Sequence, residues 1–235
     1  MDRKEILHFV DLTTLSIDDN DEVIRRLCNK ALDKKVAAVC TYPNFVKLTK
    51  QLLSGSGIKS ASVAGCFPSA QSFIEIKTAE VEYAVNSGAD EIDMVISVGK
   101  LLEGKIAEVL SEIKAIKKAC GSAKLKCIIE TGALKTKENI IIASELAIEG
   151  GSDFVKTSTG KISPAATIGT STYILETIKK YYDKTGIKIG FKAAGGISTY
   201  EEAIGYINLI KEILGEEWLT PDLFRIGASR LVDNI

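Results

Sequence analysis

The most constraining feature of this chain is a repeated alternation of short β-branched runs with longer amphipathic segments. Gly, Pro, Asn or Ser marks the joins between them. Few hairpin signals interrupt the repeat, which predicts parallel strands joined by right-handed crossovers. Eight such units close a (β/α)8 barrel. The eight expected strands cover residues 10–15, 36–41, 60–65, 91–97, 126–131, 153–157, 188–193 and 224–228.

The clearest helix is expected over residues 107–118, where Val109, Ile113 and Ile116 share one face and Gly121 follows as a stop. Further helices are expected over 139–147, 172–183 and 199–214, and an extra helix over 2–9 precedes the barrel. The prediction is an α/β fold in which residues 1–235 form a single (β/α)8 (TIM) barrel domain with an extra N-terminal helix. A doubly wound sheet or a two-domain division is the alternative at this length, although no Pro/Gly/Ser-rich linker marks a boundary.

Charge and cysteine usage exclude several classes of protein. Thirty basic and thirty-one acidic residues leave a net charge of −1, which favours neither nucleic acid nor an anionic membrane as partner. Five cysteines without a C-x-x-C spacing argue against a disulfide framework or a zinc knuckle, and the single histidine, His8, cannot supply a metal cluster. No signal peptide and no apolar run of about 18 residues is present. We therefore expect a cytoplasmic protein without a metal or cofactor.

An internal similarity singles out two ionisable residues. Within residues 87–94 (SGADEIDM), the first seven residues match residues 150–156 (GGSDFVK) in type, which aligns Asp93 with Lys156. Because successive strand residues face opposite sides, outward packing of their apolar neighbours would point both side chains into the barrel. The same alternation places Lys192 inside.

Two lysines inside a barrel predict a catalytic role for at least one of them. An ionised amine there costs several kcal/mol unless it is paired or shifted in pKa. Neighbouring strands lie about 4.8 Å apart, so Lys156 and Lys192 would interact, and burial with a like charge favours a neutral, nucleophilic amine. Asp93 would transfer protons through a water, and Asp11 is a second candidate carboxylate. The alternatives are that the lysines reach water at the barrel mouth, that the alternation is wrong by one residue, or that Asp93 is only an ion-pair partner.

Three glycine-containing loops follow the last three expected strands, at residues 157–161, 194–198 and 227–230. Glycines let backbone N–H groups approach an anion, and late barrel loops commonly bind phosphate. These loops predict a phosphorylated substrate, with ordinary turns as the alternative.

At these residues the sequence resembles the deoxyribose-phosphate aldolase family. The motifs that carry the resemblance are DLTTL at 11–15, VCTYP at 39–43, EIDMV at 91–95, IIETG at 128–132, FVKTSTGK at 154–161, GFKAAGGI at 190–197 and RIGAS at 225–229. The resemblance implies a class I aldolase (a carbon-carbon lyase) that reversibly cleaves 2-deoxy-D-ribose 5-phosphate to acetaldehyde and D-glyceraldehyde 3-phosphate, in deoxyribose phosphate catabolism. It also implies a homo-oligomer, either a dimer or a tetramer.

By this resemblance Lys156 forms the Schiff base, Lys192 perturbs its pKa, and Asp93 relays protons with a water. The resemblance also implies substrate-binding residues around the sugar and the phosphate, namely Asp11, Thr13, Cys40, Thr159, Gly160, Lys161, Gly195, Gly196, Gly227, Ala228 and Ser229.

The sequence departs from the family pattern at Ala193 and Ala194, where many members have Pro-Ala or Ala-Ser and where we expect the change to be tolerated, and at two further places. Arg230 follows Ser229 where some members have a second serine, which would strengthen phosphate binding. The chain stops at Ile235, without the tail tyrosine that some members use, so proton transfer is expected to rest on Asp93 and water. Two alternative functions remain: another lysine-dependent barrel aldolase that accepts a ketose phosphate, and a catalytically silent sugar-phosphate sensor.

Overall fold

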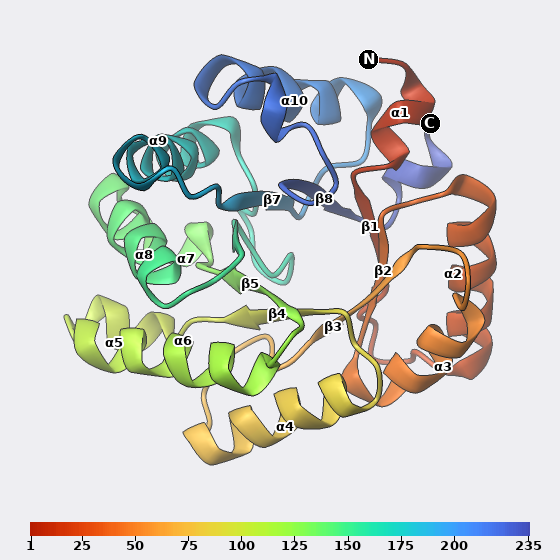
Figure 1. Ribbon diagram of the computed structural model, residues 1–235, viewed down its shortest axis with the longest axis horizontal. Coiled ribbons are helices and arrows are strands. Elements are labelled where there is room, and N and C mark those ends of the chain that lie inside the picture. Colours follow the sequence, from red (N-terminus) through yellow and green to blue (C-terminus); the bar gives the residue numbers. More distant parts are fainter.

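Eight parallel strands pair in chain order and close on themselves in a computed structural model that describes residues 1–235. Figure 1 looks along the barrel, with the strands at the centre and the helices in a ring around them. The predicted (β/α)8 barrel is confirmed. Its strands are β1 (Val10–Thr13), β2 (Ala38–Thr41), β3 (Lys59–Val63), β4 (Glu91–Val95), β5 (Lys124–Ile128), β6 (Phe154–Lys156), β7 (Gly190–Ala194) and β8 (Phe224–Ala228).

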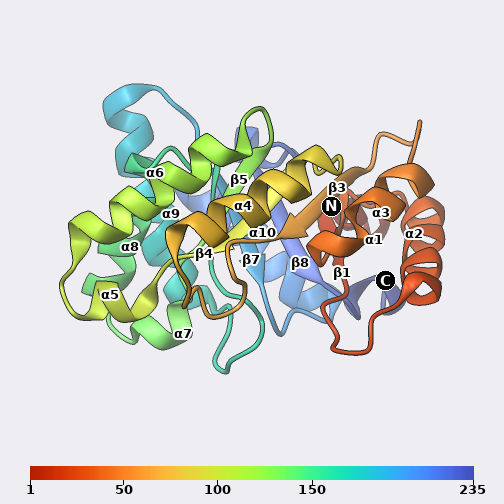
Figure 2. The ribbon, with the colours of Figure 1, turned by 90° about the horizontal axis from the view of Figure 1, so that it is seen from below.

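The outer layer consists of helices that connect successive strands. They are α2 (Asp21–Lys34), α3 (Val46–Leu52), α4 (Ile74–Asn86), α5 (Val98–Leu102), α6 (Ile106–Cys120), α7 (Thr131–Leu134), α8 (Lys137–Glu149), α9 (Ile168–Thr185) and α10 (Tyr200–Ile213). The side view in Figure 2 shows the longer helices flanking the strands. Side-chain caps begin several of them, such as Asn20 at α2 and Thr199 at α10, because these side chains accept otherwise unpaired N–H groups. None of the helices combines the length and the apolar character that crossing a membrane requires.

The expected N-terminal helix is α1 (Arg3–Leu7), which packs Ile6 and Leu7 into the core. It lies beside the C-terminal segment, as Figure 1 shows. The hydroxyl of Tyr200 in α10 donates to the carbonyl of Met1, at 3.0 Å. These contacts join the first residues of the chain to its last strand-helix unit.

Strand residues alternate between two different environments. Those that face the helices, such as Ile92, Met94, Val155 and Phe191, belong to the main apolar core. On the inner face, β2 and β3 contribute a separate cluster of small apolar side chains (Ala38, Cys40, Ala61 and Val63). The inner face of the other strands carries ionisable groups, so the polar half of the barrel lies opposite β2 and β3.

The predicted strand bounds differ from the observed ones by up to two residues at most ends, and the largest error, three residues, is at the end of β5. The expected strand over 126–131 is observed as Lys124–Ile128, and Thr131 begins α7 instead. The reason is Glu130, which adopts a left-handed conformation (φ 57°) and so ends the extended run. Its carboxylate is buried and accepts hydrogen bonds from the backbone N–H and hydroxyl of Thr159. The left-handed backbone of Glu130 therefore occurs together with a contact to the loop after β6. A local sequence pattern cannot show such a contact.

Candidate active site

Seven charged side chains converge inside the barrel, and none is more than 4% exposed. They come from six of the eight strands and form one continuous set of ion pairs. The three carboxylates and four cations are Asp11, Glu91, Asp93, Lys126, Lys156, Lys192 and Arg225.

Lys156 and Lys192 share one carboxylate oxygen. They are direct partners across β6 and β7, and their Nζ atoms lie 2.6 and 2.7 Å from Oδ2 of Asp93. The strand alternation therefore places all three side chains inside, as predicted, and both lysines are buried. On the shared neighbour β5, Asp93 pairs with Lys126 and Lys156 pairs with Ile128. In this register Lys156 therefore lies two residues further toward the carboxyl end of the strands than Asp93, with which the sequence similarity had aligned it.

The two amines differ in proton affinity. Burial lowers the pKa of Lys156, and the charge of Lys192 adds to this, although Asp93 opposes both. Burial also disfavours the Lys192 ammonium, but the carboxylates of Asp11 and Asp93 outweigh it and raise the pKa of Lys192. Despite burial, the surrounding lysines hold the pKa of Asp93 well below its usual range. The lowered pKa favours the neutral form of the Lys156 amine, beside an ammonium and a carboxylate.

The remaining members of the set lie beneath this trio. Arg225 donates to Asp11 (Nη1 to Oδ1, 2.6 Å) and to Glu91 (Nη2 to Oε1, 2.7 Å). Lys126 contacts Glu91 at 2.5 Å and Oδ1 of Asp93 at 3.0 Å. Glu91, Lys126 and Arg225 were not among the predicted site residues. The signal was present, because each occupies an inward position by the same two-residue period that identified Asp93.

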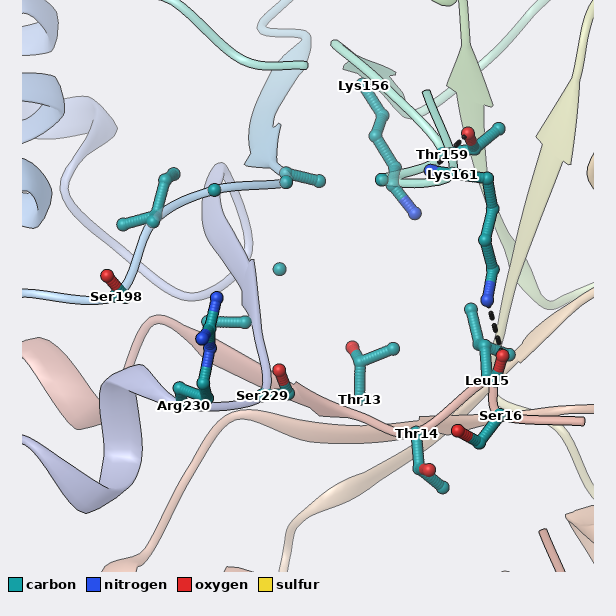
Figure 3. A pocket seen from close by; sticks show the side chains of 17 residues that line it. Thr13, Thr14, Leu15, Ser16, Lys156, Thr159, Lys161, Ser198, Ser229 and Arg230 are labelled. Carbon is teal, nitrogen blue, oxygen red and sulfur yellow. Dashed lines mark hydrogen bonds between the residues drawn. The ribbon is translucent and has the colours of Figure 1, made fainter. Parts of the chain in front are cut away.

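A cavity of about 360 Å³ opens above Lys156 at the carboxyl ends of the strands. Figure 3 shows Lys156 on one side of it, with Thr13, Ser229 and Arg230 on the opposite side. The cavity is lined by most of the predicted substrate-binding residues, namely Thr13, Thr159, Gly160, Lys161, Gly195, Gly196, Gly227, Ala228 and Ser229. Prediction had not named Thr14, Ser16 or Ser198, which also line it.

The loop after β7 requires its glycines. Gly195 and Gly196 have φ values of +91° and +85°, which other residues rarely adopt. A Cβ on Gly195 would also lie 2.5 Å from the Cβ of Ala165. The loop after β6 is fixed instead by side chains, since Thr159 donates to Glu130 and Lys161 donates to the carbonyl of Leu15. These contacts hold the rim of the cavity in place.

Two predicted substrate contacts lie elsewhere. Asp11 is fully buried and bound by Lys192 and Arg225, so it lies below the cavity rather than on its wall. Cys40 is also fully buried and belongs to the small apolar cluster of β2 and β3. Burial raises the pKa of this thiol to about 11. Both residues occupy inward positions on their strands. Asp11 lies one inward position below Thr13 on β1, a depth that the alternation does not specify, whereas Cys40 pairs with Thr13 in the register of β1 and β2 but does not line the cavity.

Comparison with known proteins gives a consistent picture. Residues 6–205 match the model of the DeoC/LacD family aldolases. The human deoxyribose-phosphate aldolase is 44% identical over 245 residues, which cover 97% of this chain and 77% of the human protein. Among solved structures, "QR15, an Aldolase" superposes with a TM-score of 0.83 at 30% identity, covering 97% of this chain and 93% of that one.

A second solved structure supports the fold. The deoxyribose phosphate aldolase of Aeropyrum pernix, whose structure is described as tetrameric, matches with a TM-score of 0.82 at 24% identity, over 99% of this chain and 91% of that one. The family match spans most of the barrel, including Asp93, Lys156 and Lys192. The buried lysine pair, the cavity above it and these similarities lead to one conclusion: the chain belongs to the DeoC/LacD aldolase family.

Proposed function

We propose that this protein is a class I aldolase that reversibly cleaves 2-deoxy-D-ribose 5-phosphate to acetaldehyde and D-glyceraldehyde 3-phosphate, with Lys156 as the Schiff-base residue. The observation that carries the proposal is the position of Lys156. Its amine has a lowered pKa, lies at the floor of the cavity, and shares Oδ2 of Asp93 with Lys192. A buried amine in this setting can attack a carbonyl near neutral pH.

In the cleavage direction, the neutral amine of Lys156 attacks C1 of the open-chain aldehyde, and loss of water gives a protonated imine. A base removes the proton of the C3 hydroxyl, the C2–C3 bond breaks, and its electron pair passes to the imine as an enamine. Protonation of C2 and hydrolysis then release acetaldehyde. Asp93 is the carboxylate closest to the amine, so we assign it the proton transfers, through a water.

The site also stabilises the cationic imine. The nitrogen of Lys156 lies 2.6 Å from Oδ2 of Asp93, so a positive charge that forms on the imine directly faces this carboxylate. Lys192 remains an ammonium, because its pKa is raised by Asp11 and Asp93. The two lysines therefore take different roles, with Lys156 reacting and Lys192 keeping it neutral between turnovers.

Lys192→Met is expected to move the pH profile. Removing the ammonium leaves Asp93 to favour protonated Lys156, so the pKa of Lys156 rises and the neutral fraction at pH 7 falls. The limb of kcat/KM that increases with pH should shift upward by about one unit. Profiles of the variant and of Lys47→Met, a substitution of an exposed lysine, provide the comparison. An unmoved limb in the Lys192 variant would contradict this role.

The phosphate is proposed to bind at the three late loops. Gly160, Gly195 and Gly196 bring backbone close to the cavity, and Arg230 contributes a guanidinium that takes part in no ion pair within the chain. Lys161, the other cation at the rim, already donates to the carbonyl of Leu15. Arg230 is therefore the cation available to the phosphate.

Arg230→Ser is expected to raise KM for deoxyribose 5-phosphate roughly 10- to 100-fold, since a charge-assisted hydrogen bond contributes about 1.5–3 kcal/mol. Cleavage of unphosphorylated deoxyribose should change little, because this substrate lacks the anion. Steady-state kinetics on both sugars measure the difference. An equal loss on the two substrates would mean that Arg230 supports the loop rather than the phosphate.

The proposed substrate is tested by cleavage of a panel of sugar phosphates. Deoxyribose 5-phosphate should yield acetaldehyde, whereas fructose 1,6-bisphosphate and other ketose phosphates should not be cleaved. Cleavage of ketose phosphates alone would assign a different aldolase reaction. Binding of deoxyribose 5-phosphate without cleavage would indicate a sugar-phosphate sensor.

The proposal extends to the setting of the enzyme. Residues 1–235 would act as one catalytic barrel domain in a homo-oligomer, a dimer or a tetramer. All five cysteines are unpaired, which fits a reducing cytoplasm.

A further inference from the structure

A second layer of charge lies beneath the lysine pair, at the amino-terminal side of the barrel interior. Arg225 and Glu91 form a two-pronged pair, with Nη1 and Nη2 of the guanidinium 3.1 and 2.7 Å from the two carboxylate oxygens. The guanidinium also lies 6.0 Å from the ring centroid of Phe154, the inward residue two positions before Lys156 on β6. Neither member of the pair lines the cavity above Lys156, so neither can touch a substrate bound there.

Two chains of ion pairs connect this pair to Asp93, one to each carboxylate oxygen. Arg225 binds Oδ1 of Asp11, Oδ2 of Asp11 binds Lys192, and Lys192 binds Oδ2 of Asp93. On the other side, Glu91 binds Lys126, which binds Oδ1 of Asp93. The carboxylate that faces Lys156 is thus held from below through both of its oxygens.

Apart from β6, which carries Lys156 itself, every strand except β3 supplies an ionisable group to the surroundings of Lys156. These groups are Asp11 from β1, the Cys40 thiol from β2, Glu91 and Asp93 from β4, Lys126 from β5, Lys192 from β7 and Arg225 from β8, with Lys161 and Arg230 at the cavity rim. Of the buried charges apart from Lys156, three are negative and three are positive. The net charge of the buried cluster is therefore zero only while Lys156 is neutral.

The proton affinity of Lys156 should respond to any change in the net charge of this buried cluster. Buried groups interact through a medium less polar than water, so one uncompensated charge within the cluster changes the proton affinity of its neighbours. Glu91 and Arg225 contribute one charge of each sign. Removing either one alone shifts the balance, and removing both restores it.

We propose that Glu91 and Arg225 are positioning residues that set the proton affinity of Lys156 from beneath the site, by fixing the net charge of the buried cluster and by holding Asp11 and Lys126 against Lys192 and Asp93. This inference rests on the proposed function in one respect, the reaction of Lys156 as a neutral amine. It adds two residues that do not contact the substrate, and it assigns them opposite effects.

The test compares Glu91→Gln, Arg225→Gln and the double variant with the wild type. Each protein is treated with acetaldehyde and cyanoborohydride over a range of pH, and the rate of ethylation at Lys156 is read by mass spectrometry. Glu91→Gln leaves an excess of positive charge, so the midpoint of Lys156 labelling should fall by about one pH unit. Arg225→Gln leaves an excess of negative charge, and the midpoint should rise by a similar amount. The double variant should return close to the wild type.

Opposite shifts distinguish this role from a structural one. Loss of packing alone would move both single variants in the same direction or lower the labelling rate at every pH, and either result overturns the proposal. If Arg225→Gln does not fold, Glu91→Gln and the double variant decide the question: a lowered midpoint that the second substitution restores supports the pair, and any other pattern refutes it. Absence of labelling at Lys156 in the wild type would instead overturn the proposed function.

Discussion

Lys156→Met is expected to lower aldol cleavage by at least about 10⁴-fold while leaving the barrel folded. The substitution removes the only amine that both lines the cavity and has a lowered pKa. Methionine fills most of the same volume and carries no charge. Because the buried cluster favours the neutral form of Lys156, replacing it with an uncharged side chain should leave the fold intact. Turnover and the unfolding transition of the same preparation measure the two effects.

A matched substitution separates loss of the nucleophile from loss of any buried lysine. Lys77 is also buried, where it pairs with Glu112 at 3.1 Å in the helical layer, and it does not line the cavity. Lys77→Met should therefore reduce stability but keep the imine chemistry. Near wild-type cleavage by the Lys156 variant would remove that residue from the mechanism.

Asp93→Asn is expected to damage both stability and catalysis. Asp93 accepts from Lys126, Lys156 and Lys192, so the neutral amide leaves three buried amines short of a carboxylate. Removing one partner of a buried ion pair costs about 3–5 kcal/mol in the free energy of unfolding. Loss of the proton relay should lower kcat by about 10²–10⁴-fold. Denaturant unfolding and steady-state kinetics measure the two losses separately.

The stability difference between wild type and Asp93→Asn should depend on pH. The folded state holds the pKa of Asp93 well below its usual range, so its stabilising effect is complete above the unfolded value of about 3.9 and is lost as pH falls below it. Asp222→Asn is the control, because Asp222 forms an exposed pair with Lys124 that contributes about 0–1 kcal/mol. Equal and small effects of the two substitutions would contradict the buried network.

Much of the fold could be predicted from residue pattern. The eight strands, the helix over 106–120 and the N-terminal helix were located to within a few residues, because apolar periodicity and glycine stops are local signals. The boundary error at Glu130 came from a left-handed residue whose carboxylate binds Thr159, a contact between segments 29 residues apart.

The candidate site could be predicted in part for the same reason. Strand alternation placed Asp93, Lys156 and Lys192 inside the barrel, and glycine-containing loops indicated the rim of the cavity. The extent of the buried network was missed. Alternation shows that Glu91 and Arg225 face inward, but it does not show which side chains from other strands they contact. Asp11 was placed too high, since alternation specifies a face of the strand but not a depth within the barrel.

The central claim is that Lys156 forms an imine with the substrate, and its most direct test is trapping. The wild-type protein is incubated with deoxyribose 5-phosphate, reduced with borohydride, digested, and read by mass spectrometry to the modified residue. The account predicts a covalent adduct on Lys156, with Lys126 and Lys192 unmodified because both are held as ammonium ions in the buried cluster. An adduct on Lys192, or none on any lysine while cleavage proceeds, would contradict it.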